Sequence, residues 1–191
     1  LPNVVDWVNG GDTPRTVKDA SFAPCRLLSL QTRISAAYKG LSILLMQRGG
    51  KDFISATPVA INAYFVTPVD IHHFFPKAWC TAKNLPREKW NSVINKTPLS
   101  STTNQYLSGD APSLYLKRTE EKKEPGENAG PLLRSHAIPV EQIRQTAFDG
   151  SIRHRAILLL AMLDSSMAQT VLDPTATYTS LPSATPSNLH R

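Results

Sequence analysis

The residues best suited to chemistry lie between Asp70 and Asn104. His72 and His73 are adjacent, and Pro76 follows three residues after the second histidine. Neighbouring side chains in a strand point to opposite faces, so both histidines can serve one site only where the strand ends and the chain bends, as Pro76 favours. Histidine is the usual general base near neutral pH because its reference pKa is about 6.5. The pair therefore indicates acid–base or metal chemistry.

Asn104 adds a possible oxygen ligand. It lies near the middle of a short helix predicted over residues 100–107 and capped by Ser100 or Ser101. An asparagine there contributes little as a cap and can project its amide oxygen toward a metal ion. An imidazole together with an oxygen ligand suits a hard divalent ion, although other metal ions also bind this pair of ligands. From the residues alone, a second interpretation stays open, namely a partly buried histidine pair among turn asparagines.

Helices are predicted on both sides of this segment. Apolar residues recur at spacings of three and four from Leu27 to Arg48, which predicts one amphipathic helix that ends at Gly49-Gly50. Residues 53–71 are β-prone and broken by prolines, so we expect extended structure there. Further elements follow in chain order: a helix from Pro76, a helix around 86–90, a charged surface loop over 117–130 and a closing helix with its apolar face on residues 152–167.

The bulk composition suits one domain with a tail. Apolar residues make up 41% of the 191 positions, enough for a core, and no apolar run approaches the roughly 18 residues of a membrane helix. Residues 173–191 are rich in Thr, Ser and Pro and bury too little apolar surface to offset ordering entropy. We expect a domain over 1–172. Because the sequence begins at Leu1 without a signal segment, we expect it to be part of a longer protein.

The positive charge is concentrated in the middle of the chain. The net charge is +6, and residues 71–123 carry nine basic against four acidic groups. A basic excess around one site suits a polyanionic substrate, because Lys and Arg neutralise phosphates and release counterions. Solvated surface lysines are the alternative interpretation. The candidate phosphate contacts are Lys77, Lys83, Arg87, Lys89 and Lys96.

Cys25 and Cys80 are the two cysteines, and each lies among apolar neighbours. They are too few for a disulfide framework or a CxxC zinc site. We predict buried free thiols in a reducing bacterial cytoplasm.

The segment "DIHHFFPK", followed by "NSVINKTPLSSTTN" and "GDAPSLYL", resembles the HNH (ββα-metal) nuclease motif. It is most similar to the DUF1524 branch, found C-terminal to a DUF262 NTPase-like domain in GmrSD-type restriction enzymes and in SspE-like phosphorothioate-sensing phage-defence proteins. The resemblance covers roughly residues 10–168. It implies an α+β, mostly helical fold, in which a ββα-metal hairpin and helix, about residues 60–107, lie between flanking helices.

The resemblance implies a role for each matching residue. His73 would be the general base that takes a proton from the attacking water, oriented through its other nitrogen by the backbone of the second strand. His72 and Asn104 would hold one divalent ion, Mg²⁺ or Mn²⁺, at the scissile phosphate. Asn95, in the second strand, would tie the two strands together so that His73 keeps its orientation. Asp70 is a candidate partner of a histidine, with a strand-end cap as the alternative.

The implied function is a metal-dependent DNA endonuclease, the effector part of a restriction or antiviral-defence protein. A single site of this kind would nick one strand, and an upstream DUF262-like NTPase domain of the same chain would be its partner. The 22 residues from His73 to Asn95 exceed the spacing of compact HNH motifs, which requires the extra helix. Two alternatives stay open: an inactive nucleic-acid-binding module, and a ββα domain held by structural zinc, which needs three or four soft or imidazole ligands.

Overall fold

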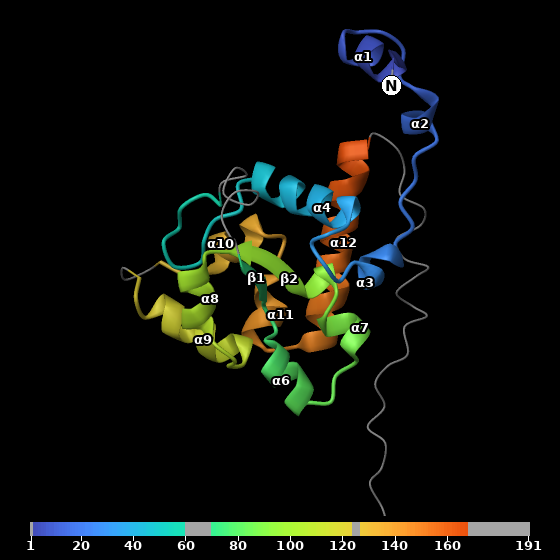
Figure 1. Cartoon of the computed structure of the whole chain (residues 1–191). Helices are drawn as coiled ribbons and strands as arrows, with labels where there is room; N and C mark the ends of the chain where they lie inside the picture. Colours follow the sequence, from blue (N-terminus) through green and yellow to red (C-terminus); the bar gives the residue numbers. More distant parts are fainter. Residues whose placement is uncertain (1, 60–69, 124–126, 168–191) are drawn as a thin grey trace, which may run out of the picture.

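The structure is a computed structural model that describes residues 2–59, 70–123 and 127–167. Within this part the fold is α+β and mostly helical, as expected (Figure 1). Its one sheet pairs β1 (Asp70–His73) with β2 (Lys96–Leu99) in antiparallel register. His72 lies opposite Thr97, and His73 lies opposite Lys96 at the end of the ladder. The bend expected after the histidines is therefore present.

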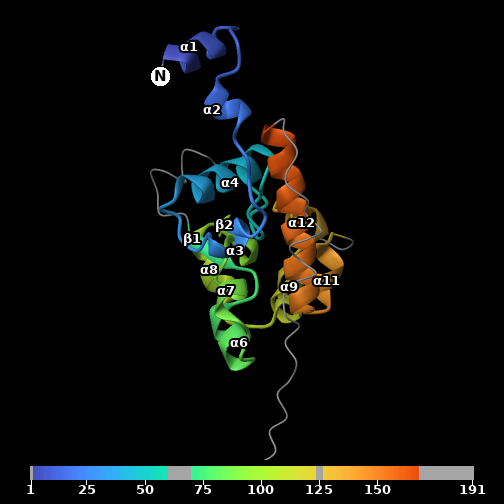
Figure 2. The same cartoon turned by 90° about the vertical axis from the view of Figure 1, so that its right-hand side faces the viewer.

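The described residues before β1, 2–59, contain four helices: α1 (Pro2–Val8), α2 (Arg15–Lys18), α3 (Arg26–Ser29) and α4 (Ala36–Gln47). Figure 2 shows α1 and α2 projecting from the body of the molecule. The single helix predicted from Leu27 to Arg48 is wrong. Leu30 leaves the helical conformation with ψ 88°. Ser35 then starts a new helix, because its Oγ accepts a hydrogen bond from Tyr38 N at 3.2 Å.

The chain between the strands contains the short helices expected from its prolines. Pro76 caps α6 (Lys77–Ala82), and Pro86 caps α7 (Arg87–Trp90). A 3₁₀ turn, η1 (Val93–Asn95), leads directly into β2. After β2, Ser100 Oγ accepts from Thr103 N at 3.2 Å and starts α8 (Ser101–Leu107), as predicted. The Ser100 cap therefore starts α8 directly after β2.

Four helices complete the described chain: α9 (Pro112–Glu120), α10 (Gly130–Ser135), α11 (Val140–Arg144) and α12 (Phe148–Met167). The charged loop predicted over 117–130 begins too early, because residues 117–120 continue α9 from its first-turn Pro112. Of the extended segment predicted over 53–71, residues 53–55 form a turn and residues 60–69 lie outside the described residues. The predicted tail over 173–191 lies outside them as well.

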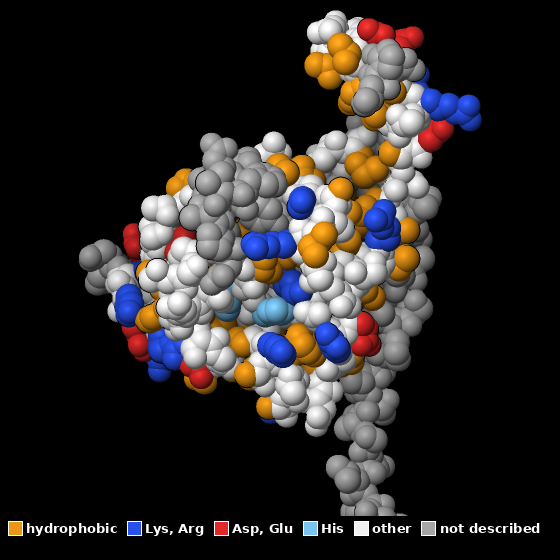
Figure 3. All heavy atoms as spheres, in the orientation of Figure 1, with side chains coloured by type: hydrophobic (Ala, Val, Ile, Leu, Met, Phe, Trp, Pro, Cys, Tyr) orange, Lys and Arg blue, Asp and Glu red, His pale blue; other side chains and the backbone are white. Residues whose placement is uncertain are grey.

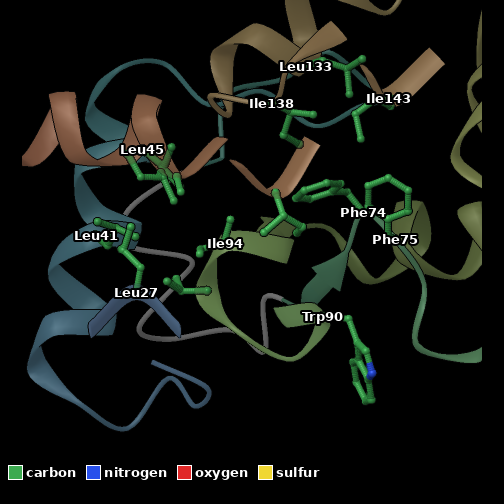
Figure 4. Close-up of a cluster of buried hydrophobic side chains, with 14 of the residues drawn as sticks. Leu27, Leu41, Leu45, Phe74, Phe75, Trp90, Ile94, Leu133, Ile138 and Ile143 are labelled. Atoms are coloured by element: carbon green, nitrogen blue, oxygen red, sulfur yellow. The ribbon is translucent and has the colours of Figure 1, made fainter. Parts of the chain in front are cut away.

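One hydrophobic core joins these helices to the sheet. Figure 4 shows side chains from α3, α4, α10 and the segments around the strands converging, with Ile94, Phe74 and Phe75 beside the sheet. Each of these three is 0% exposed and contributes about 1.5–3 kcal/mol by burial. Cys80 is buried as predicted, whereas Cys25 is exposed. Among the described residues, no helix combines the length and hydropathy that crossing a bilayer requires.

Candidate functional site

The two histidines at the end of β1 differ in exposure. His72 is 3% exposed, whereas His73 is half-buried. Figure 3 shows histidine side-chain atoms reaching the surface near the middle of the domain, with Lys and Arg side chains around them. The alternation of side chains along the strand, followed by the bend at Pro76, lets one histidine face α8 while the next reaches solvent.

His72 and Asn104 meet between β1 and α8. His72 Nδ1 and Asn104 Oδ1 are 2.7 Å apart. His72 Nε2 is buried and has no hydrogen-bond partner among the described residues. Burial lowers the pKa of His72 to about 4, and the contact with Asn104 opposes this only in part. The ring is therefore neutral at physiological pH, which is the form of histidine that binds metal ions.

This donor pair fits one divalent ion. Two neighbouring ligands of an octahedral ion, each at about 2.1 Å, lie about 3 Å from one another. The 2.7 Å contact is a hydrogen bond in which His72 Nδ1 donates to Asn104 Oδ1, and its length is close to the separation that a shared ion requires; such an ion would take the place of the proton on Nδ1. In the described part of the chain, no three His, Cys, Asp or Glu side chains gather at one point.

Asp52 fixes the start of the helix that carries Asn104. Its carboxylate accepts hydrogen bonds from Thr103 Oγ1 at 2.6 Å and from Ser100 N at 3.0 Å. Burial alone would raise the pKa of Asp52, but the hydrogen bonds from Thr103, Ser100 and Ser55 outweigh it and lower the pKa. The charged carboxylate also suits the positive end of α8. Asp52 was not predicted from the sequence, because its partners lie about 50 residues further along the chain.

His73 has a neutral ring held mainly by neighbouring side chains. Burial and, to a smaller extent, the positive charge of Lys96 lower its pKa to about 4. Its Nε2 lies 3.4 Å from Asn91 Oδ1, and its ring packs at a tilt on Trp90 with 5.9 Å between centroids. The resemblance implied a backbone partner from the second strand. The structure instead places the Asn91 side chain at this nitrogen.

Asn95 is fully buried just before β2, in η1 and not in the strand as the resemblance implied. Its Oδ1 accepts from Phe75 N at 2.9 Å, and its Nδ2 donates to Phe75 O at 2.9 Å and to Trp90 O at 2.8 Å. These bonds join the chain that leaves β1 to the chain that enters β2. The side chain thereby holds the bend that follows the two histidines.

The basic candidates divide into two groups. Lys77, Lys83 and Arg87 are exposed on and around α6 and α7. Lys89 is 6% exposed, and its Nζ forms an ion pair of 2.8 Å with Asp149. Because that ammonium is already compensated by a carboxylate, we do not retain Lys89 as a phosphate contact.

Lys96 differs from expectation in another way. Lys96 is also 6% exposed, and its Nζ donates to Gln31 O at 2.6 Å. Burial lowers its pKa to about 8. It therefore lies within the site beside His73 and not on an open lysine surface. The Asp70 backbone pairs with Leu99 in the sheet, and its side chain lies outside the described residues.

Arg155 of α12 is 0% exposed, and its guanidinium binds main-chain carbonyls at the start of β2 and just before it. Its Nη1 donates to Ile94 O at 2.5 Å and to Lys96 O at 2.8 Å, and its Nη2 donates to His136 O at 3.2 Å. This arginine was not predicted from the sequence. The available signal was its position on the apolar face of the closing helix, next to Ala156.

Comparison with known proteins places few constraints on this geometry. No family model matches the chain, and no solved structure matches it. An uncharacterized protein of Methanocaldococcus jannaschii, MJ0686, is 29% identical over 119 residues, which cover 60% of this chain and 20% of that protein. The chain therefore spans about a fifth of the length of this curated relative. The chemistry has to be inferred from the site itself.

The arrangement combines three chemical capabilities. His73 offers a neutral imidazole at a half-buried position, which can accept a proton. His72 and Asn104 offer a nitrogen atom and an oxygen atom, 2.7 Å apart, as ligands for one ion. Exposed cations on α6 and α7 favour an anionic substrate. Together these groups suit hydrolysis of a phosphate ester.

Proposed function

We propose that this chain is a metal-dependent DNA endonuclease domain of the HNH (ββα-metal) type. The observation that carries the proposal is the meeting of His72 Nδ1 and Asn104 Oδ1 at 2.7 Å, from residues 32 apart in the sequence. The two residues that the resemblance assigns to one ion are thus adjacent in space. His73, its proposed base, lies next to them at the end of the hairpin formed by β1 and β2.

In the proposed reaction, His73 accepts a proton from the water that attacks the phosphate. Its neutral ring is ready for this without prior deprotonation. Asn95 keeps the bend after β1 in place through its bonds to Phe75. His72 and Asn104 would hold Mg²⁺ or Mn²⁺, which supplies stabilisation of the charge that develops on the phosphate and on the leaving 3′ oxygen.

The proposed substrate is DNA, bound through its phosphates. Lys77, Lys83 and Arg87 present exposed charges near the site, and phosphate contacts of this kind carry no sequence information. One set of catalytic groups cuts one strand per event, so a monomer nicks. In the whole protein, an upstream DUF262-like NTPase domain would control cutting in restriction or antiviral defence; this part of the proposal rests on the resemblance.

The deciding experiment incubates supercoiled plasmid with the protein and Mg²⁺ or Mn²⁺, with and without EDTA. We expect conversion to open circles that EDTA abolishes, and no conversion by His73→Ala, since this change removes the base and little of the core. His154→Ala is the matched control, because His154 is exposed on α12. Circular dichroism checks that each variant folds.

Either of two results would overturn the proposal. Nicking by His73→Ala at the wild-type rate would show that His73 is not the base. If the wild-type protein binds DNA but leaves it intact with either metal, the chain is a binding module instead.

A further inference from the structure

The break between α3 and α4 frees two backbone carbonyls that a continuous helix would use internally. In a helix from Leu27 to Arg48, the carbonyls of Leu30 and Gln31 would accept from the amides four residues later. In the structure, Leu30 O accepts from Val93 N at 2.7 Å, and Gln31 O accepts from Lys96 Nζ at 2.6 Å. The connector between the helices therefore docks on the segment that leads into β2.

The Gln31 side chain extends this docking to Asn91. Asn91 Nδ2 donates to Gln31 Oε1 at 3.3 Å. With its nitrogen used in this way, the Asn91 amide presents its oxygen to His73, whose Nε2 is 3.4 Å away. Hydrogen bonds at catalytic groups are often this long before substrate binds and shorten in the reacting complex.

The direction of these bonds determines the tautomer of His73. Asn91 Oδ1 can only accept, so His73 Nε2 must carry the proton and Nδ1 must carry the free lone pair. In the described part of the chain, Asn91 is the hydrogen-bond partner of the His73 ring. Trp90 packs against the ring at a tilt and limits its rotation.

We propose that Gln31 and Asn91 form a hydrogen-bond relay that fixes the tautomer and direction of His73, which makes both of them positioning residues. The relay presents Nδ1 of His73 as the atom that takes the proton from water. Its catalytic consequence rests on the proposed function, whereas the relay itself does not.

The kinetic test uses Asn91→Leu, which keeps the approximate size of the side chain and removes the acceptor. We expect the kcat for nicking to fall about 10- to 100-fold, as for other groups that orient a site histidine, with the KM for DNA unchanged. Asn91→Asp, which keeps an acceptor, should restore most of the rate. Gln31→Leu should lower kcat less, and Gln47→Leu, at an exposed position of α4, should not change it.

The structural test is the ¹⁵N spectrum of the His73 ring near neutral pH. We expect the Nε2–H tautomer with a slowly exchanging proton in the wild-type protein, and loss of that protection in Asn91→Leu and Gln31→Leu. A wild-type Nδ1–H tautomer, or unchanged protection in both variants, would overturn the relay. These spectra need no nuclease activity, so a protein that fails to nick would refute the proposed function and still report on the relay.

Discussion

Asn95 pairs with the main chain of Phe75 through two hydrogen bonds of 2.9 Å, one in each direction. A single buried amide thus acts as a strand partner at the point where β1 has ended. Its further bond to Trp90 O, at 2.8 Å, also fixes the end of α7. Three parts of the chain around the histidines depend on this one side chain.

Asn95→Ala should lower the free energy of unfolding by about 1–3 kcal/mol, because the buried Phe75 N and Trp90 O lose the hydrogen bonds that Asn95 makes to them. Nicking should fall as well, because the bend after His73 loosens. Urea denaturation gives the stability change, with Gln47→Ala, at an exposed position of α4, as the comparison. Unchanged stability would show that neighbouring groups or water replace the amide.

Asn104→Ala should weaken metal binding and nicking, and it should lower the melting temperature modestly, because the buried His72 Nδ1 loses its hydrogen-bond partner. Calorimetric titration with Mn²⁺ measures the affinity, and Asn104→Asp, which keeps an oxygen donor, should retain binding. A large loss of stability in Asn104→Ala, combined with wild-type Mn²⁺ affinity, would make Asn104 a scaffold residue and not a ligand.

Arg155→Met should destabilise the fold by at least about 1–3 kcal/mol, the cost of leaving one buried acceptor without a donor. Arg155→Lys should recover only part of this, because an ammonium lacks the planar fork that reaches several carbonyls. Arg153→Met, at an exposed position of the same helix, is the control. Thermal and urea unfolding provide the measurement, and a stable Arg155→Met protein would mean that packing of α12 suffices.

Acid should destabilise the protein between pH 6.5 and pH 4. His72 and His136 are buried, and burial lowers the pKa of each to about 4, below the usual histidine value of 6.5. The unfolded chain therefore binds protons first, and stability present above pH 6.5 is lost as the pH falls toward 4. The slope is about 1.4 kcal/mol per pH unit for each histidine.

Urea titrations at several pH values between 4 and 7.5 measure this slope. His136→Gln should reduce it, and His154→Gln, at an exposed position, should leave it unchanged. A stability that stays constant from pH 6.5 to pH 4.5 would contradict the assignment of neutral buried rings.

DNA binding should be weak, indifferent to sequence and strongly dependent on salt. Lys77→Ala and Lys83→Ala should each reduce the salt slope by about one unit and weaken binding equally for unrelated duplexes. Lys89→Ala should not change the slope, because its ammonium is paired with Asp149. Fluorescence anisotropy across a salt series measures all three variants; tight binding of one duplex at high salt would indicate base readout.

Local signals in the sequence predicted the elements that frame the site. Pro76 and Ser100 mark helix starts through their own backbone geometry and hydroxyl group, and both helices begin there. The break after α3 was not predictable in this way, because the apolar spacing continues through Ile34. That residue is 81% exposed in the structure, since the carbonyls of Leu30 and Gln31 bond to the segment before β2 instead.

The remainder of the candidate site depends on partners far apart in the sequence. Lys89 looked like a surface lysine until α12 placed Asp149 beside it, 60 residues later. Arg155 supports the turn before β2 across a similar separation, and Asp52 reaches α8 from the other direction. Residue types and spacing indicated the histidines and asparagines, but no pattern within one element shows which distant group will hold them.

Arg155 also bears on when the site becomes complete during synthesis. A nascent chain that has folded only as far as α9 already contains His72, His73, Asn95 and Asn104, yet it lacks the guanidinium that holds the carbonyls of Ile94 and Lys96. The segment before β2 gains this support only after α12 has left the ribosome. If the proposed function holds, a chain still being translated carries an unfinished nuclease and does not cut DNA until α12 has emerged.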